Sequence, residues 1–334
     1  MISREIRLRR YPSGRAGADD FVTVERAVRP PAQGEVRVRN LVLSLDPYMR
    51  DRMDPLTRYV EPFRLDEPMT GRVIGEVVIS RSPGLPVGAR VVHQLGWREV
   101  AQGPSSLFER LPEDGLPLEA HLSLLGMTGL TAWVGLTQVA RMAPGSTVLV
   151  SAAAGAVGST VGLLARRYGA GRAIGSAGGP AKRRLLLDRL GFDEAIDYRA
   201  APIREQLRRI AADGVDVYFD NVGGDHLEAA IDVMRDHGVV VVCGAISGYD
   251  AETRSPGPDN LEQIMDKALR LEGFRVSEYV GMMPALAAEL APDIAAGRIE
   301  SLTTVYEGLD NAVTAFLDLM SGRTTGKTLV RLGR

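Results

Sequence analysis

A turn of small residues is the part of the sequence best suited to hold a phosphate-bearing ligand. Residues 148–158 read Val-Leu-Val-Ser-Ala-Ala-Ala-Gly-Ala-Val-Gly; Gly155 and Gly158 take the second and third glycine positions of a dinucleotide-binding turn, and Ala153 takes the first. The free amides at the start of the next helix would favour the charge of a pyrophosphate. The alternative is a tight strand-to-helix turn without a ligand. The residues expected to contact the ligand here are Ala154, Gly155, Ala156, Val157 and Gly158.

The segment after the second predicted strand indicates which dinucleotide binds. NAD sites usually place Asp or Glu there to hold the ribose 2′-hydroxyl. Here residues 176–179 are Ser-Ala-Gly-Gly, and Lys182, Arg183 and Arg184 follow. A 2′-phosphate is attracted by cations and repelled by a carboxylate, so the segment favours NADPH. The missing acid also disfavours an S-adenosylmethionine-dependent methyltransferase. For the three cations the alternative is a solvated helix face.

Two patterns along the chain predict the elements that would position these residues in an α/β protein. Up to about residue 120, short β-type runs such as 35–39, 73–79 and 89–92 are broken by Pro and Gly, which is typical of a barrel or sandwich. From about residue 145, apolar strands alternate with helices, which predicts a parallel sheet covered on both faces. The expected strands are 147–150, 173–175, 195–197, 216–220 and 238–242, and the expected helices are 156–168 and 180–190. Residues 326–331 return to the β pattern, so the tail can rejoin the first part.

Composition excludes several other classes of protein. The net charge of −2 gives no general attraction to nucleic acid or to anionic membranes. Cys243 is the only cysteine, which rules out an intrachain disulfide and a thiolate zinc site, and the four histidines show no metal-ligand spacing. The sequence shows neither a signal-peptide pattern nor an apolar run of bilayer length, so we expect a cytoplasmic protein.

Five motifs carry a resemblance to a known family. They are Leu43–Arg50 (LSLDPYMR), Gly126–Trp133 (GMTGLTAW), Ala152–Gly158, Asp220–Gly224 (DNVGG) and Cys243–Ser247 (CGAIS). In this order the chain resembles the zinc-independent medium-chain dehydrogenase/reductases, specifically the leukotriene B4 12-hydroxydehydrogenase/prostaglandin reductase group of NADPH-dependent double-bond reductases.

The resemblance implies an architecture and a set of cofactor contacts. It implies a GroES-like catalytic domain over 1–125, completed by 303–334, a Rossmann NADPH-binding domain over 126–302, and a homodimer. Lys182 would hold the 2′-phosphate, and Tyr198 would lie against the adenosine. Thr324 stands where the family carries Asn, which puts its contact in doubt. The contacts implied beyond the small-residue turn are Met127, Thr131, Gly178, Lys182, Tyr198, Asn221, Cys243, Gly244, Ala245, Ile246, Ser247, Phe274, Arg275, Val276 and Thr324.

The chemistry implied by the resemblance is the transfer of a hydride from NADPH to the β-carbon of an α,β-unsaturated ketone or aldehyde. Negative charge then develops on the carbonyl oxygen, which requires a hydrogen-bond donor such as a tyrosine hydroxyl. Tyr48 and Tyr249 are the candidates, and for each the alternative is a pocket wall or a buried aromatic. Asp46 and Arg50 are expected to shape the loop that carries Tyr48.

Two other functions stay open on the sequence alone. One is a quinone oxidoreductase of the same superfamily, which the stretch Asp46–Arg50 disfavours. The other is a non-catalytic NADPH-binding protein, which would share the whole set of cofactor contacts.

Overall fold

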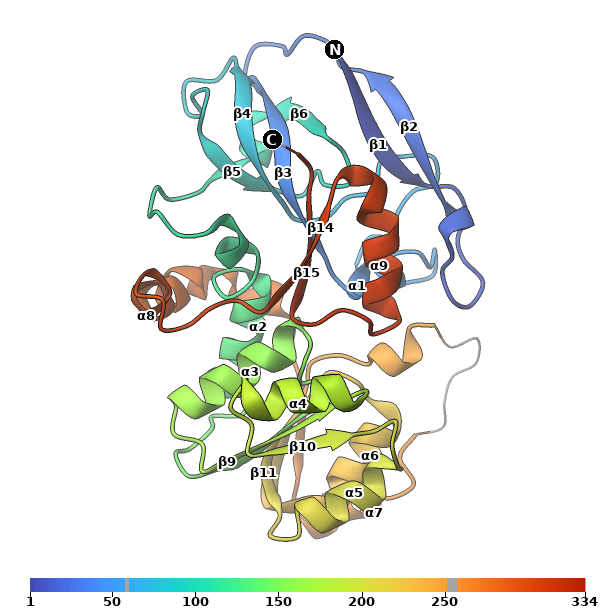
Figure 1. Ribbon diagram of the computed structural model, residues 1–334, viewed down its shortest axis with the longest axis vertical. Helices are drawn as coiled ribbons and strands as arrows, with labels where there is room; N and C mark the ends of the chain where they lie inside the picture. Colours follow the sequence, from blue (N-terminus) through green and yellow to red (C-terminus); the bar gives the residue numbers. More distant parts are fainter. Residues whose placement is uncertain (58–59, 251–256, 334) are drawn as a thin grey trace. The chain divides into compact units, whose positions relative to one another are not determined.

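The computed structural model describes residues 1–57, 60–250 and 257–333. Its contacts divide the chain into two compact units, Met1–Leu122 with Thr303–Arg334 and Ser123–Leu302 (Figure 1). Among the described residues, no helix combines the length and apolar character that crossing a membrane requires.

The first unit is built mainly from antiparallel strands. Seven strands form one sheet in the order β14-β15-β3-β4-β5-β7, with β6 also paired to β3, and β1 and β2 form a separate hairpin. Its strands are β1 (Ile2–Leu8), β2 (Phe21–Ala27), β3 (Glu35–Leu45), β4 (Val73–Ser80), β5 (Arg90–His93), β6 (Val100–Pro104), β7 (Glu109–Arg110), β14 (Thr303–Glu307) and β15 (Lys327–Arg331). Its helices are α1 (Tyr48–Asp51) and α9 (Ala312–Met320).

The C-terminal tail enters this sheet beside β3. β15 runs antiparallel to β3, with Thr328 opposite Leu45, and β14 runs parallel to β15. The β pattern of residues 326–331 therefore identifies the tail strand correctly. Residues 35–39 alternate between polar and apolar types, but their burial does not alternate, because Arg37 is buried with Val36 and Val38. The Arg37 guanidinium is tolerated there because it donates to Gln102 Oε1 (2.9 Å) and to the Arg29 carbonyl.

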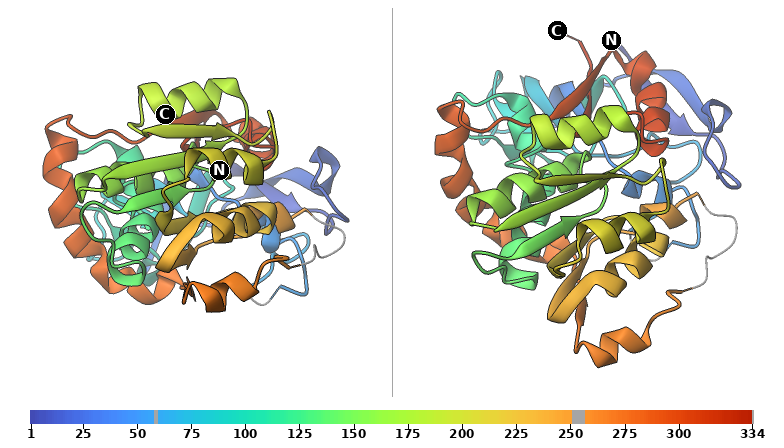
Figure 2. Two further views of the ribbon diagram at one scale, coloured as in Figure 1. Left: turned by 90° about the horizontal axis from the view of Figure 1, so that it is seen from below. Right: turned by 60° about the horizontal axis from the view of Figure 1, so that its bottom comes forward.

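The second unit is a six-stranded parallel sheet with helices on both faces (Figure 2). Its strands are β8 (Thr147–Val150), β9 (Arg172–Ala177), β10 (Glu194–Asp197), β11 (Val215–Asp220), β12 (Met234–Val242) and β13 (Arg270–Gly273). Its helices are α2 (Met127–Val134), α3 (Ala156–Arg167), α4 (Pro180–Asp188), α5 (Ile203–Ile210), α6 (Gly224–Val233), α7 (Glu262–Asp266) and α8 (Met283–Ala295). The order β10-β9-β8-β11-β12-β13 is that of a Rossmann fold, so the expected fold class is confirmed.

Continuous apolar strands hold this sheet between its helices. Val148, Leu149 and Val150 of β8 are at most 1% exposed, as expected for a strand covered on both faces. The strand order reverses between β8 and β11, and in such sheets ligands bind beyond the carboxyl ends of the strands at that reversal. The residues that follow β8 and β11 are therefore the first place to look for a site.

Candidate cofactor and catalytic sites

The small-residue turn lies at the carboxyl end of β8 and opens α3. Gly155 caps the helix with extended backbone, and the first turn of α3 contains no acidic residue, so its free amides present partial positive charge. A side chain at Gly158 is excluded, because a Cβ there would lie 2.4 Å from the Ala152 carbonyl oxygen and 2.7 Å from the Ala153 Cα. The turn therefore has the close helix–strand packing that a bound pyrophosphate requires.

Asn221 follows β11 and is fixed against the end of β8. Its side-chain amide donates to the Ser151 carbonyl (2.8 Å), and its backbone N–H donates to Ser151 Oγ (2.8 Å). The two loops at the strand reversal are thus joined through Ser151, which sequence reasoning assigned only to the turn. Asn221 is held in one position at the edge where the ribose is expected.

A buried carboxylate beneath Asn221 organises the same edge. Asp220 is 1% exposed, and its Oδ1 accepts hydrogen bonds from the Tyr218 hydroxyl (2.7 Å) and from the N–H groups of Val222 (3.0 Å) and Gly223 (2.9 Å). Burial and the charge of Asp220 raise the pKa of Tyr218 well above its usual value, so the phenol stays protonated. Sequence reasoning missed Asp220 as a functional residue, although it stands at the end of an apolar strand, where a buried carboxylate needs donors.

The residues expected to bind the 2′-phosphate meet at the carboxyl ends of β9 and β10. A Cβ at Gly178 would lie 2.7 Å from the Tyr198 hydroxyl and 2.8 Å from Arg199 Nε, so a larger residue there would displace these two side chains. Burial, with the nearby charge of Arg199, lowers the pKa of the partly buried Lys182. Two cations therefore converge beside Gly178, and sequence reasoning missed Arg199.

Two other charged side chains at this end are engaged by the backbone. Asp197 Oδ1 accepts from the N–H groups of Gly179 (2.7 Å) and Arg199 (3.0 Å), so this carboxylate braces the loops. Arg183 donates from Nε to the Ala195 carbonyl (2.9 Å), so its guanidinium is engaged by the backbone of β10.

The loops after β12 and β13 leave the sheet next to each other. Val242 pairs with Gly273, so Cys243 and Phe274 are adjacent strand ends. The Cys243 and Gly244 amides donate to the Asp220 carbonyl (2.9 and 3.0 Å), which ties this loop to the end of β11. Burial raises the pKa of the Cys243 thiol to about 12, so the thiol is not a nucleophile at neutral pH.

The remaining predicted residues of the second unit lie on or beside these loops. Ser247 donates from Oγ to the Val222 carbonyl (2.6 Å), and Tyr249 ends the short helical turn Ile246–Gly248. On α2, Thr131 Oγ1 donates to the Met127 carbonyl (2.7 Å), so these two residues share one face of a helix that packs on α3. The edge formed by the ends of β8, β11, β12 and β13 gathers the residues Ala154–Gly158, Asn221, Cys243–Ser247 and Phe274–Val276.

Tyr48 and Thr324 belong to the first unit. Tyr48 is the first residue of α1, just beyond β3, and packs partly buried against the core cluster that contains Met49 and Met53. Thr324 is 6% exposed and accepts from Thr328 Oγ1 (3.0 Å). That Tyr48 and Tyr249 face one substrate stays a prediction.

Two arginines near Tyr48 were not predicted as site residues from the sequence. Arg52 lies one helical turn after Tyr48, donates to the Glu61 carbonyl (2.8 Å) and holds its guanidinium 4.0 Å from the centre of the Phe63 ring. Burial lowers the pKa of Arg52 and of Arg72; Tyr48 and Glu61 oppose this shift at Arg52, and Glu109, Asp46 and Tyr48 oppose it at Arg72. Among the described residues, the buried Arg72 Nε has no hydrogen-bond partner. Two guanidiniums therefore interact electrostatically with Tyr48.

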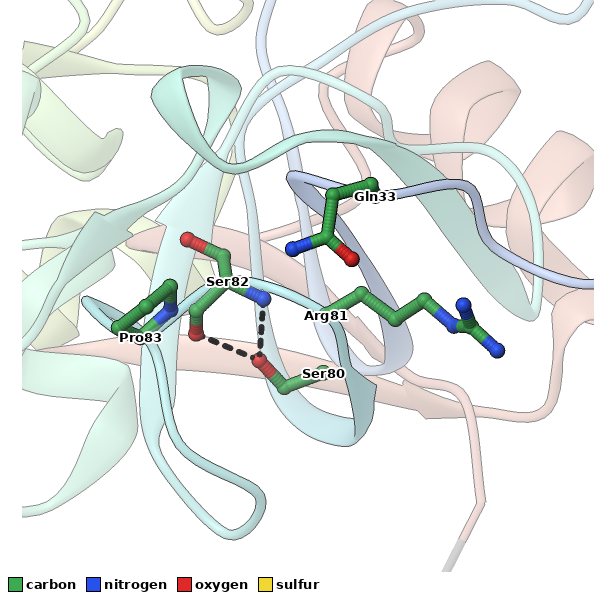
Figure 3. Close-up of a pocket in the computed structure, with 5 residues that line it drawn as sticks. All are labelled: Gln33, Ser80, Arg81, Ser82 and Pro83. Carbon is green, nitrogen blue, oxygen red and sulfur yellow. Dashed lines mark hydrogen bonds between the residues drawn. The ribbon is translucent and has the colours of Figure 1, made fainter.

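A separate depression lies in the first unit, at the end of the β3–β4 pair that is farther from Tyr48. It is lined by Gln33 and residues 80–83, where Ser80 Oγ donates to the Ser82 carbonyl (2.8 Å) (Figure 3). In the β3–β4 register Val36 faces Ser80 and Leu43 faces Val73, so the depression is roughly 23 Å along the strands from the end that carries Tyr48. It belongs to neither candidate site.

Two family models match the chain, one in each of its two units. A family model described as the N-terminal domain of oxidoreductase matches residues 4–111, and one described as zinc-binding dehydrogenase matches residues 156–291. Within the described ranges, no group of three or more His, Cys, Asp and Glu side chains could hold a metal ion.

Relatives match over nearly the whole chain. A putative NADP-dependent oxidoreductase, YfmJ, of Bacillus subtilis is 42% identical, covering 98% of this chain and 97% of the relative. The 2-alkenal reductase (NADP(+)-dependent) of Nicotiana tabacum is 37% identical, with 99% and 98% covered. The structure of CurA from Vibrio vulnificus in complex with NADPH is 35% identical, covers 99% of both chains and superimposes with a TM-score of 0.94. The chain belongs to the medium-chain dehydrogenase/reductase family, among its zinc-independent, NADP-dependent double-bond reductases.

Proposed function

We propose that this protein uses NADPH to reduce the C=C bond of α,β-unsaturated ketones and aldehydes. The observation that carries the proposal is the pair of cations, Lys182 and Arg199, beside Gly178 on a Rossmann sheet, where an NAD site would place an acid. Relatives named as a 2-alkenal reductase, a curcumin reductase and a pulegone reductase support the substrate class.

The residues of the second unit fit NADPH in their chemistry. The amides at the start of α3 suit the pyrophosphate, Lys182 and Arg199 suit the 2′-phosphate, and Tyr198 offers an aromatic face to the adenosine. Asn221 is held rigidly enough to orient the ribose. When bound, NADPH supplies the hydride. The loops Cys243–Ser247 and Phe274–Val276 then border the nicotinamide end.

The catalytic task of the chain is to stabilise charge on the substrate carbonyl oxygen. As the hydride reaches the β-carbon, electron density moves to that oxygen, and a neutral hydroxyl that donates to it lowers the barrier. We assign this donation to Tyr48 and Tyr249. Arg52 and Arg72 polarise the Tyr48 hydroxyl, since a nearby positive charge favours partial negative charge on its oxygen.

The proposal extends to domain roles, assembly and location. The first unit corresponds to a catalytic domain over 1–125 completed by 303–334, and the second to an NADPH-binding domain over 126–302. A homodimer is supported by β13, which is the edge strand of the parallel sheet and exposes backbone groups that a second copy could pair. A cytoplasmic location accords with the single cysteine.

The test follows NADPH absorbance while the purified protein is mixed with enones, enals and quinones. Consumption with enones and enals is the expected result. Consumption only with quinones would instead favour a quinone oxidoreductase. Tight NADPH binding without consumption by any of the three would contradict an enzymatic role and favour a binding protein.

A further inference from the structure

Lys327 is a buried lysine in the first unit whose partners all precede Tyr48. Its side chain is 2% exposed, and its ammonium donates to the Leu45 carbonyl (3.1 Å) and to Asp46 Oδ1. A buried ammonium is strongly destabilising unless it is paired and hydrogen-bonded. The position of Asp46 is therefore tied energetically to that of Lys327.

Asp46 is also hydrogen-bonded to the first turn of α1, the helix that begins at Tyr48. Its Oδ2 accepts from Ser44 Oγ (2.6 Å), and its carbonyl accepts from the Met49 N–H (3.1 Å) at the first turn of α1. Pro47, with φ −59°, has a fixed backbone angle between Asp46 and Tyr48. Few rotations remain free between the ion pair and the Tyr48 side chain.

The other end of the ion pair lies on the tail. Lys327 begins β15, which runs antiparallel beside β3, so the start of β15 lies at the end of β3 that leads into α1 (Figure 1). Gly326 precedes it in the left-handed region (φ 62°), and Thr324 is joined to Thr328 through their hydroxyls. The ion pair thus connects the segment with the expected cofactor contact, Thr324, to the segment with the expected donor, Tyr48.

We propose that Lys327 and Asp46 are positioning residues for the reduction, and that their buried ion pair fixes the Tyr48 hydroxyl. This inference rests on the proposed function, in which Tyr48 donates to the substrate carbonyl. An apolar pair of similar volume would hold two strands together at least as well, because burying two charges costs more free energy than it usually returns. What the ion pair adds is one fixed geometry at the strand end.

The charges around Tyr48 support the same role. Arg72 interacts electrostatically with both Asp46 and Tyr48, and Arg52, directly after α1, interacts with Tyr48. Three carboxylates act on these arginines, Glu109 and Asp46 on Arg72 and Glu61 on Arg52, and Asp46 is the one that lies two residues before Tyr48. By holding it toward the tail, Lys327 keeps it from pairing with Arg72 and from opposing negative charge near Tyr48.

The test is a double-mutant cycle of Lys327→Met and Tyr48→Phe, measured with NADPH and an enone. We expect Lys327→Met to lower kcat about 10- to 100-fold in the Tyr48 protein, since a displacement of about 1 Å can slow a reaction about 100-fold. In the Tyr48→Phe protein the same change should alter kcat less than about two-fold, because the hydroxyl to be positioned is gone. Equal effects in both backgrounds, or no effect in the first, would overturn the inference.

The two proposals fail differently in this cycle. If Tyr48→Phe alone leaves kcat unchanged, the catalytic role of Tyr48 fails. If Tyr48→Phe lowers kcat and Lys327→Met does not, only the positioning role fails.

Two further variants separate positioning from folding and from charge balance. Asp46→Asn keeps the size and one acceptor oxygen but removes the charge, and should lower kcat while thermal unfolding shows a folded protein. Lys327→Met with Asp46→Asn removes both charges, and it should stay slow because the tether is still missing. Full recovery of kcat in that double variant would show that only charge balance matters, which would overturn the inference.

A matched control lies at the other end of the same strand. Glu35, the first residue of β3, pairs with Arg29 (2.6 Å), and it lies roughly 35 Å along the strand from Asp46. Glu35→Gln should leave kcat unchanged, although it also removes an ion pair from β3.

Discussion

Replacing Lys182 with alanine tests whether the second unit distinguishes NADPH from NADH through the 2′-phosphate. A charged hydrogen bond contributes about 1.5–3 kcal/mol. Lys182 is only partly buried, and Arg199 remains beside Gly178 after the change, so the lower end of that range applies. We therefore expect about 1.5 kcal/mol, or roughly 10-fold weaker NADPH binding, while NADH binding changes less than about two-fold.

The assay is calorimetric titration of each nucleotide into the wild-type and variant proteins. Arg183→Ala is the matched control, because the Arg183 guanidinium donates to the Ala195 carbonyl and is not expected to bind the 2′-phosphate. Adding Arg199→Ala to Lys182→Ala should bring NADPH affinity close to that of NADH. Equal losses for both nucleotides in Lys182→Ala would refute the reasoning.

The pH dependence of NADPH affinity offers a second readout of the same contact. Burial and the charge of Arg199 lower the pKa of Lys182, and a bound phosphate raises it again because it favours the ammonium. Affinity should therefore be full below the lowered pKa and fall as the pH rises through it. In Lys182→Ala, NADPH affinity should no longer fall at alkaline pH. If it falls as in the wild-type protein, a group other than Lys182 causes the decrease.

Three further predictions concern other parts of the two sites. Gly158→Ala should abolish NADPH binding or destabilise the protein by about 1–3 kcal/mol in denaturant unfolding, because its Cβ would meet the Ala152 carbonyl at 2.4 Å; normal binding and stability would show that the turn can relax. Tyr249→Phe should lower turnover with an enone about 10- to 100-fold at unchanged NADPH affinity, and unaltered turnover would remove Tyr249 from the catalytic residues. Cys243, whose pKa burial raises to about 12, should resist iodoacetamide at neutral pH in the folded protein; rapid alkylation detected by mass spectrometry would contradict this.

The second unit is the part of the molecule that the sequence predicts most closely. Strand 147–150 matches β8, and the expected helix 156–168 differs from α3 by one residue, because strands covered on both faces leave a continuous apolar signal. The strand expected at 238–242 begins earlier, at Met234, since the polar residues before Gly238 hide the extended backbone. Once the strand order is known, the site at their carboxyl ends follows.

Local sequence patterns do not predict residues whose partners are distant in the sequence. Arg199 follows the third strand of the parallel sheet, yet it lies beside the phosphate site that we propose after the second. The parallel pairing of Asp197 with Ala177 brings it there. Asp220 looks like an ordinary strand end in the sequence, and only its burial with four donors shows that it braces the cofactor loops.

The surroundings of Tyr48 show why the first unit is harder to predict than the second. Arg52 after α1 and Arg72 before β4 act on Tyr48 electrostatically, and Lys327 on the tail pairs with Asp46, two residues before it. Within the described residues, neither arginine pairs with a carboxylate inside 4 Å, while Asp46 is taken up by Lys327. The reaction we propose creates a negative charge on the substrate oxygen. A site that pairs its carboxylate with Lys327 and leaves its guanidiniums without a carboxylate partner is prepared for that charge before the substrate arrives, which is the arrangement that lowers a barrier most effectively.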